Sequence, residues 1–281
     1  AGFQADLLMP GLRFKLWPVY TVSKHPWVQV PAGELGVVIA QVGDPTAIGA
    51  KSAVYRPEFG NFSDIRVFLD NGGQKGVQRP VLTPGSLLPL HPAAFIVLTP
   101  NRAYDMPTTP DLVNLAKHGR LTPSAFGLEP AQLSVTVIAP QGNSDYVGIV
   151  TALEGLPLDK GDIASRLGGY GDILTAEQAG ASDAEVVEQL LASQNSAHNN
   201  YQDFQRFLDH GGRIGLQHDP LLYGAYLLNP FLVRVELVPM LVVNQGQVAV
   251  VKSFVGLPTI DPSGEEFKFG SIVAPGHRGI W

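Results

Sequence analysis

Short apolar stretches separated by turn residues recur along the whole chain. Some alternate with polar residues and others run continuously apolar, and both patterns are typical of strands in small sheets. Pro31-Ala32-Gly33-Glu34 has the composition of a tight turn between two of these stretches. The pattern predicts strands over residues 14–22, 27–30, 35–42, 95–99 and 133–138.

Residues 64–70 have the pattern of a short helix instead. Asn61 or Ser63 is available as its N-cap, and Gly72-Gly73 stops it after two turns at most. We therefore expect small β-modules that each carry one short helix.

One block of the sequence occurs three times. It begins with a Gly-x-Gln tripeptide at Gly2, Gly76 and Gly215, has a glycine nine residues later, and then reaches a Leu-x-Pro motif. The glycines at offset nine are Gly11, Gly85 and Gly224, and we expect them to occupy tight turns.

A second block joins an apolar stretch to a glycine seven residues further on. Its first copies contain Gly36 and Gly148, a third copy has Ala249 at this place, and the later glycines are Gly43, Gly155 and Gly256. We expect all five of these glycines to be turn positions that shape each module.

A third block contains an aspartate and a phenylalanine four residues apart, followed by Gly-Gly. The pairs are Asp64 with Phe68 and Asp203 with Phe207. A catalytic pair normally occurs once in a chain, so carboxylates that recur at equivalent places, Asp70 and Asp209 included, are interpreted as helix caps or turn residues.

The Gly-x-Gln tripeptide divides the chain into predicted repeats over residues 2–75, 76–214 and 215–278, with 279–281 as the start of a further repeat. The middle repeat is longer because of two insertions, at about 101–132 and 168–199. The first insertion contains a helix predicted over residues 110–117 that ends at His118-Gly119, and in the second Ser182 caps a helix that includes residues 186–191. The insertions are expected on one face of the array. Because the chain begins with Ala1 and ends inside a repeat, we expect more of the array on both sides.

The composition supports a β-rich fold. Glycine and proline make up 31 and 23 of the 281 residues, which excludes a long helical bundle, whereas an apolar content of 45% permits a folded core. The net charge of −6 and the lack of a basic block argue against nucleic-acid binding. The apolar stretch 227–243 is broken by polar residues and prolines, so no membrane-spanning helix is expected within these residues.

Motifs for catalysis are absent from the sequence, and without cysteine there are no thiolate sites. The Gly168-Gly169-Tyr170-Gly171 stretch is a weak candidate for phosphate binding, because no basic residue follows it. A second candidate is a metal cluster of His198, His210, His218, Asp209 and Asp219. The residues equivalent to His210 and His218 in other repeats are Asn71 and Arg79, which are not metal ligands. We therefore favour the interpretation that the cluster residues are solvated turn residues. We expect no catalytic, metal-binding or cofactor-binding residue and no cofactor.

Two further patterns have a structural and a functional interpretation. Trp17, Trp27, Trp281 and Tyr20 would suit an aromatic platform for glycans, but the repeat does not demand them, and a core or subunit-interface role is favoured. Asn61-Phe62-Ser63 fits a glycosylation sequon that we interpret as incidental.

The blocks described above, with Val30-Pro31-Ala32-Gly33-Glu34-Leu35-Gly36-Val37-Val38 at their centre, resemble the tandem β-repeats of large bacterial flotillin-like proteins. These belong to the stomatin, prohibitin and flotillin family, also called SPFH or band 7, and their repeat design is similar to that of the major vault protein. The resemblance covers most of residues 2–281. It implies a mostly β (α+β) fold and a membrane-associated scaffold, with the bacterial inner membrane as the expected location and its side unknown.

Two functions remain open. The first is a non-enzymatic scaffold that forms a homo-oligomer of many subunits, in a ring or a cage, reaches the membrane through segments outside these residues and organises a membrane-protein client. The alternative is a surface-projecting module that binds a glycan or a protein client through the insertions. An enzyme is the least favoured class, because no nucleophile or acid–base pair stands out.

Overall fold

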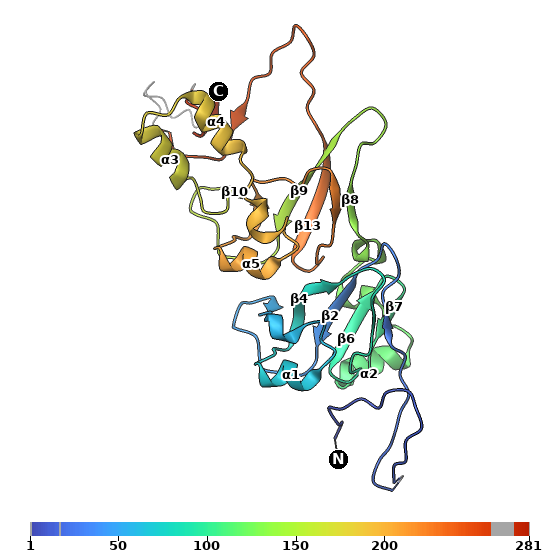
Figure 1. The fold of residues 1–281 in the computed structure, drawn as a ribbon. Helices are drawn as coiled ribbons and strands as arrows, with labels where there is room; N and C mark the ends of the chain where they lie inside the picture. The colour runs from blue at the N-terminus through green and yellow to red at the C-terminus, as the bar shows by residue number, and fades with distance from the viewer. Residues whose placement is uncertain (1, 17, 260–272, 281) are drawn as a thin grey trace. The chain divides into compact units, whose positions relative to one another are not determined.

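The computed structural model describes residues 2–16, 18–259 and 273–280 (Figure 1). The fold is mixed α/β, with several small sheets and short helices, in agreement with the β-rich class expected from the sequence. Two compact units are present. The first consists of Ala1–Val135 with Leu227–Leu232, and the second of Thr136–Tyr226 with Val233–Trp281.

The first unit is built on a five-stranded sheet with the order β3-β4-β2-β6-β7. Strand β2 pairs antiparallel with both β4 and β6, whereas β3 lies parallel to β4. The strands are β2 (Gly36–Ala40), β3 (Ser52–Ala53), β4 (Gly76–Leu82), β6 (Phe95–Thr99) and β7 (Arg102–Tyr104), and a separate pair joins β1 (Val28–Gln29) to β5 (Leu87–Leu88).

Helices cover the first sheet from both sides. On one face η1 (Pro57–Phe59) and α1 (Ile65–Asp70) bring Phe59, Phe62 and Phe68 against Phe95, with neighbouring ring centroids 4.9 to 6.0 Å apart. The segment with α2 (Pro110–Lys117), η2 (Pro123–Phe126) and η3 (Pro130–Leu133) supplies the second cluster, in which Leu128 and Leu133 join the buried side chains of β2 and β6. The central strands are therefore apolar on both faces.

The second unit contains a four-stranded sheet with the order β10-β11-β9-β13. Its strands are β9 (Tyr146–Ala152), β10 (Ala164–Ser165), β11 (Gly215–Gln217) and β13 (Val233–Pro239). Two smaller pairs are β8 (Thr136–Ile138) with β12 (Gly224–Tyr226) and β14 (Lys252–Ser253) with β15 (Gly279–Ile280). The helices are α3 (Gly171–Gln178), α4 (Asp183–Leu191), η4 (Asn195–His198) and α5 (Phe204–Asp209).

The two main sheets have the same connectivity. Ala40 at the end of β2 pairs with Gly76 and Phe95, and Ala152 at the end of β9 pairs with Gly215 and Val233. In both sheets the Gly-x-Gln strand also carries a short parallel strand on its outer edge, β3 or β10. Each sheet thus combines strands that precede a Gly-x-Gln tripeptide with strands that follow it. The boundaries of the two compact units therefore differ from the repeat boundaries, which were predicted at these tripeptides.

Several local expectations are confirmed. Strand β6 and helix α2 have the predicted bounds, and Ser182 caps α4 with a reciprocal hydrogen bond to Glu185. Three others need correction. Residues 14–16 and 18–22 form no strand, because no described strand lies beside them to accept their hydrogen bonds. The cap of α1 is Asp64 itself and neither Asn61 nor Ser63, and the predicted strand 133–138 is a 3-10 turn ending at Leu133 followed by β8.

The turn glycines divide into two groups. Those with the left-handed backbone that favours glycine are Gly11, Gly85, Gly224, Gly43, Gly155 and Gly256. Gly36 and Gly148 were expected in turns but lie in strands β2 and β9, and Gly224, despite its positive φ, is the first residue of strand β12. A side chain at Gly148 would lie 2.5 Å from Ile138 and 2.8 Å from Val235, so close packing, not turn geometry, explains a glycine at this position.

Candidate functional site

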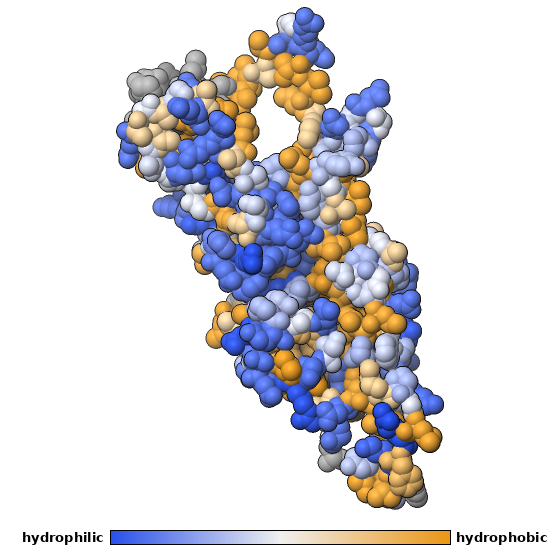
Figure 2. Space-filling view, viewed as in Figure 1, coloured by the Kyte–Doolittle hydropathy of each residue, from blue (hydrophilic) through white to orange (hydrophobic). Residues whose placement is uncertain are grey.

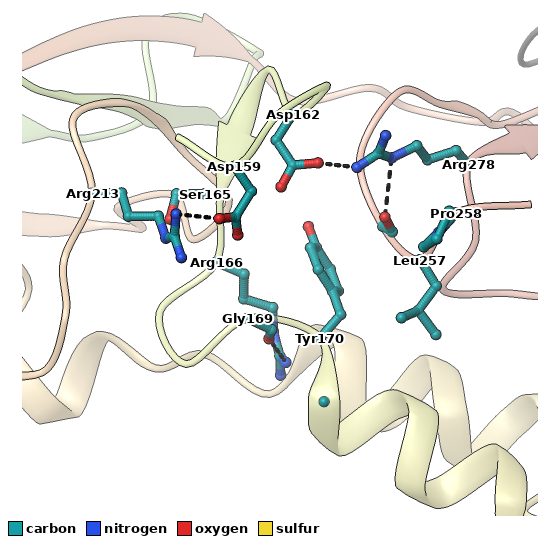
Figure 3. Close-up of a pocket in the computed structure, with 12 residues that line it drawn as sticks. Asp159, Asp162, Ser165, Arg166, Gly169, Tyr170, Arg213, Leu257, Pro258 and Arg278 are labelled. Carbon is teal, nitrogen blue, oxygen red and sulfur yellow. Dashed lines mark hydrogen bonds and ion pairs between the residues drawn. The ribbon is translucent and has the colours of Figure 1, made fainter. Parts of the chain in front are cut away.

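A pocket of about 230 Å³ lies in the second unit (Figure 3). Its wall comes from four parts of the sequence: residues 159–171 after β9, Arg213 before β11, the turn Gly256–Pro258, and Arg278. Loops and the first residue of α3 place these side chains around the pocket.

Two arginines of the pocket, Arg213 and Arg278, connect separate loops by hydrogen bonds and ion pairs. Arg213 donates hydrogen bonds of 2.7 Å to Oδ1 of Asp159 and 2.8 Å to the carbonyl of Pro157. Arg278 forms an ion pair with Asp162 and donates to the carbonyls of Gly256 and Gly161, at 3.1 and 3.3 Å. Each guanidinium therefore balances a carboxylate and satisfies turn carbonyls at the same time.

The third arginine, Arg166, is buried under the pocket, with only 1% of its side chain exposed. It donates to Oδ1 of Asp172 at 2.6 Å, to the carbonyl of Gly169 at 2.9 Å and to that of Gln189 at 3.2 Å. Partial burial by itself would raise the pKa of Asp172, but the hydrogen bond and charge of Arg166 outweigh it and lower the pKa. The pair remains ionised and ties α3 and α4 together.

Tyr170 points into the pocket from the start of α3 (Figure 3). Burial raises the pKa of its phenol to about 12, so the hydroxyl stays protonated at neutral pH. No described residue forms a hydrogen bond with this buried hydroxyl. The pocket thus contains a neutral phenol, whose hydroxyl has no hydrogen-bond partner among the described residues, beside three arginines that are each paired with a carboxylate. This lining suits a small polar ligand.

The glycine stretch predicted as a weak phosphate candidate forms the rim of this pocket. Gly169 and Gly171 line it, but both backbone groups of Gly169 are engaged with Arg166: its carbonyl accepts from the guanidinium, and its N–H donates to the carbonyl of Arg166. A phosphate site needs free backbone N–H groups, and Gly169 does not offer one to a ligand.

The histidines considered for metal binding are each engaged with their own neighbours. His198 is buried, and its Nδ1 accepts a hydrogen bond of 2.8 Å from the backbone N–H of Tyr201. Burial lowers the pKa of His198 to about 4. Nδ1 of His210 lies 2.7 Å from the carbonyl of Arg206, and Nδ1 of His218 lies 3.1 Å from Asp219. Within the described residues no group of three or more metal-ligating side chains is assembled.

The recurring aspartates and phenylalanines occupy equivalent places in the two units. Asp64 caps α1 by accepting from the N–H groups of Arg66 and Val67, and Asp203 caps α5 by accepting from that of Arg206. Phe68 packs over Gly73, where an added Cβ would meet its ring, and Phe207 packs over Gly212 in the same way. Asp209 accepts a hydrogen bond of 2.8 Å from Gln205, so it is a surface residue of α5.

The residues proposed for an aromatic platform are placed only in part. Tyr20 and Trp27 are exposed at 45% and 39%, and Trp17 and Trp281 lie outside the described residues.

A surface that sequence reasoning missed lies between β13 and β14. Residues 240–251, named here the C-terminal arm, leave the sheet and return to β14 with their apolar side chains in solvent (Figures 1 and 2). Leu241 is 82% exposed, Val242 71%, Val248 93% and Val250 74%. The signal was present in the sequence, because Val248–Val251 repeats the apolar pattern of β2. Among the described residues, no strand covers Val248–Val251 as β6 covers β2.

No family model, no curated protein and no solved structure matches this chain. Among the described residues, no helix has both the length and the apolar character that crossing a bilayer requires.

Proposed function

We propose that this chain is a non-enzymatic structural scaffold, the repeat region of an SPFH-type membrane-associated assembly that self-associates into a ring or a cage. The observation that carries the proposal is the repeated strand pairing, in which β2 and β9 each lie between a Gly-x-Gln strand and a second antiparallel strand. Modules with the same strand connectivity can stack on one another and form the wall of a ring or a cage.

Side-chain contacts support a tandem design. Gln78 donates to the carbonyls of Gln74 and Gly76 at 2.9 and 3.0 Å, and Gln217 donates to those of Arg213 and Gly215 at 2.9 and 2.8 Å. The bridges Asp44 to Gln74, Leu156 to Arg213 and Leu257 to His277 follow the same parallel pattern. The same turn thus occurs three times, each time with a glycine of positive φ directly before the bridge: Gly43, Gly155 and Gly256.

Strand edges supply a route to self-association. Strands β7 and β13 end the two main sheets, and an edge strand has backbone groups available for pairing with another chain. The scaffold would act through such edges and would contact membrane and membrane-protein clients through other parts of the assembly.

Mass photometry and negative-stain imaging of the protein in its natural full-length form test the proposal. The expected result is a narrow population of very large rings or cages. A monomer or small oligomer across the concentration range would overturn it.

One observation favours a second candidate, the binding module. The pocket beside the second insertion contains the buried Tyr170 hydroxyl without a described partner. If it binds a sugar or another small polyol, a panel of monosaccharides should perturb amide resonances near Tyr170, and Tyr170→Phe should abolish the effect. Unchanged spectra for the whole panel would reject this candidate.

A further inference from the structure

Strand β13 forms one edge of the second sheet, beside β9 (Figure 1). The equivalent strand of the first sheet, β6, lies between β2 and β7, whereas among the described strands β13 pairs only with β9. Strand β7 begins three residues after Thr99, and the equivalent position after β13 is Met240. Met240 does not turn back, because its N–H donates to the carbonyl of Asp145 at 2.8 Å and continues the pairing along β9. The open edge is therefore produced by residues that the structure describes.

Backbone groups of β13 face this open edge. Gly148 of β9 exchanges two hydrogen bonds of 2.8 Å with Leu221, so its N–H and C=O point away from β13. Leu237 lies directly opposite Gly148, and in such a non-hydrogen-bonded pair its own N–H and C=O point away from β9. The direction alternates along a strand, so Val235 and Val233 also direct their backbone groups to the edge.

The side chains of β13 are also accessible. Strand β6 is buried along its whole length, whereas in β13 Arg234 and the residues from Glu236 to Pro239 are exposed. Arg234 and Glu236 form no ion pair or hydrogen bond with another described residue. An accessible edge with two unpaired charges of opposite sign suits a partner strand that presents the same charges in reverse order.

Strand β13 is itself such a partner. When two copies of its Val-Arg-Val-Glu-Leu sequence are aligned antiparallel about Val235, Arg234 of each copy lies opposite Glu236 of the other. Val233 then lies opposite Leu237 on the other face of the sheet. The residues whose backbone groups face the edge are also opposite one another, as a hydrogen-bonded antiparallel pair requires.

The charges select this register over its neighbours. The two nearest registers that keep the hydrogen bonds place Arg234 opposite Arg234 or Glu236 opposite Glu236, and like charges directly opposite each other are destabilising. The intermediate registers place outward-facing backbone groups opposite inward-facing ones and lose the hydrogen bonds. Larger shifts separate the opposite charges and shorten the paired segment.

We propose that β13 of one copy pairs antiparallel with β13 of a second copy, centred on Val235, and joins two four-stranded sheets into one continuous sheet. Both copies contribute the same strand, so the contact is isologous and closes after two copies. Such pairs would assemble into a ring or a cage through a second, different contact. The inference deepens the proposed scaffold function and rests on the self-association in it.

A single cysteine tests the register, because this chain contains none. Val235→Cys lies opposite its own copy, where Cα atoms about 5.5 Å apart are within disulfide reach. The matched control is Leu237→Cys on the same face, whose two copies would be about 14 Å apart along the strands. The whole chain is oxidised and separated by non-reducing electrophoresis, and any disulfide-linked dimer must join two copies.

The expected result is at least about tenfold more disulfide-linked dimer for Val235→Cys than for Leu237→Cys. Equal yields, whether high or low, would overturn the proposed pairing and indicate that another partner covers β13. A higher yield for Leu237→Cys would also overturn it, because that result requires a different register.

A charge exchange tests the recognition without cysteine. Arg234→Glu places like charges opposite each other twice in the pair, so the dissociation constant of the dimer should rise about tenfold. The double variant Arg234→Glu with Glu236→Arg restores opposite charges and should restore the affinity. Analytical ultracentrifugation measures all three proteins, and a dissociation constant that the single change leaves unaltered would contradict the proposed register.

Mass photometry of the natural full-length protein separates this contact from the scaffold function. Large assemblies without the selective disulfide would reject the β13 contact and leave the scaffold function standing. A selective disulfide in a protein that forms nothing larger than a dimer would establish the contact and overturn the ring or cage.

Discussion

Single residues in this protein are constrained mainly by close backbone approach and by burial of polar groups. Gly155 illustrates the first constraint, since its φ is +152° and an added Cβ would lie 2.7 Å from the carbonyl oxygen of Gly212. His198 illustrates the second, since its imidazole is buried beside Tyr201 and Phe207. Each leads to a measurable expectation.

Gly155→Ala should lower the free energy of unfolding by about 2–4 kcal/mol, because it combines left-handed strain with a backbone clash. Gly168→Ala is the matched control: its φ is +75°, but its Cβ would meet nothing within 4 Å. The control should cost only about 1–2 kcal/mol. Urea denaturation measures both, and equal costs would show that the turn can open to admit a side chain.

The stability of the fold should decrease at acidic pH because of His198. Burial lowers its pKa to about 4 in the fold, against about 6.5 in an unfolded chain. The unfolded state therefore binds more protons between pH 6.5 and 4, and the stability contribution present at pH 7 is lost as the pH falls through this window. The loss should be about 2–3 kcal/mol.

His198→Asn separates this effect from other acid-sensitive groups, because asparagine offers an acceptor to the N–H of Tyr201 but does not ionise. Denaturation at pH 7 and pH 4 should show a smaller difference for the variant than for the natural protein. The charged or titratable groups that influence His198 are Asp219, Asp203 and His210. The same pH dependence in both proteins would assign the acid sensitivity to those neighbours.

At the scale of elements, short helices are held by their caps and by one aromatic side chain each. Helices α1 and α5 have six residues, too few for stability in isolation. Their N-caps and the packing of Phe68 and Phe207 over glycines therefore determine whether they form.

Asp64→Ala and Asp203→Ala should each reduce stability by about 1 kcal/mol, because backbone N–H groups lose their acceptor. Asparagine at either position should restore most of the loss. Asp70→Ala, at the exposed end of α1, should change stability by less than about 0.5 kcal/mol. Thermal denaturation measures the set, and a loss at Asp70 as large as at Asp64 would indicate a charge effect instead of capping.

The first insertion was expected to lie on one face of the array, but part of it belongs to a core. Leu128 is 4% exposed and packs in the cluster that contains Val37 and Ile96. Leu128→Ala should therefore cost about 2–4 kcal/mol, whereas Asn114→Ala on exposed α2 should cost less than about 0.5 kcal/mol. Calorimetric melting of both variants checks this. An unchanged stability for Leu128→Ala would show that the insertion does not contribute to the core.

At the scale of the whole molecule, each sheet needs strands from both sides of a Gly-x-Gln tripeptide. A chain cut after residue 75 loses β4 and β6, both neighbours of β2, and should be unfolded by circular dichroism. A chain cut after residue 135 keeps the five-stranded sheet and should fold. Its stability should be reduced, because Asn229 donates to the carbonyls of Gln78 and Arg79 at 2.9 and 3.1 Å. A folded product of residues 1–75 would contradict this account.

The sequence by itself determined the features that depend on neighbouring residues. The bounds of β6 and α2, the cap of α4 and the positive φ at Gly11, Gly85, Gly43, Gly155 and Gly256 follow from local periodicity, capping and backbone sterics. The recurrence of Asp64 and Asp203 predicted a structural role as a helix cap or a turn residue, and the structure shows that both are N-caps.

Only the tertiary structure decided which strands pair and which side chains meet. Residues 14–16 and 18–22 have a strand-like pattern but no described partner, and Gly36 and Gly148 are required by residues that pack on their strands. The pocket joins residues more than one hundred positions apart, such as Asp162 and Arg278. A strand forms only when another backbone accepts its hydrogen bonds, and this partner is chosen by the fold, not by the local sequence.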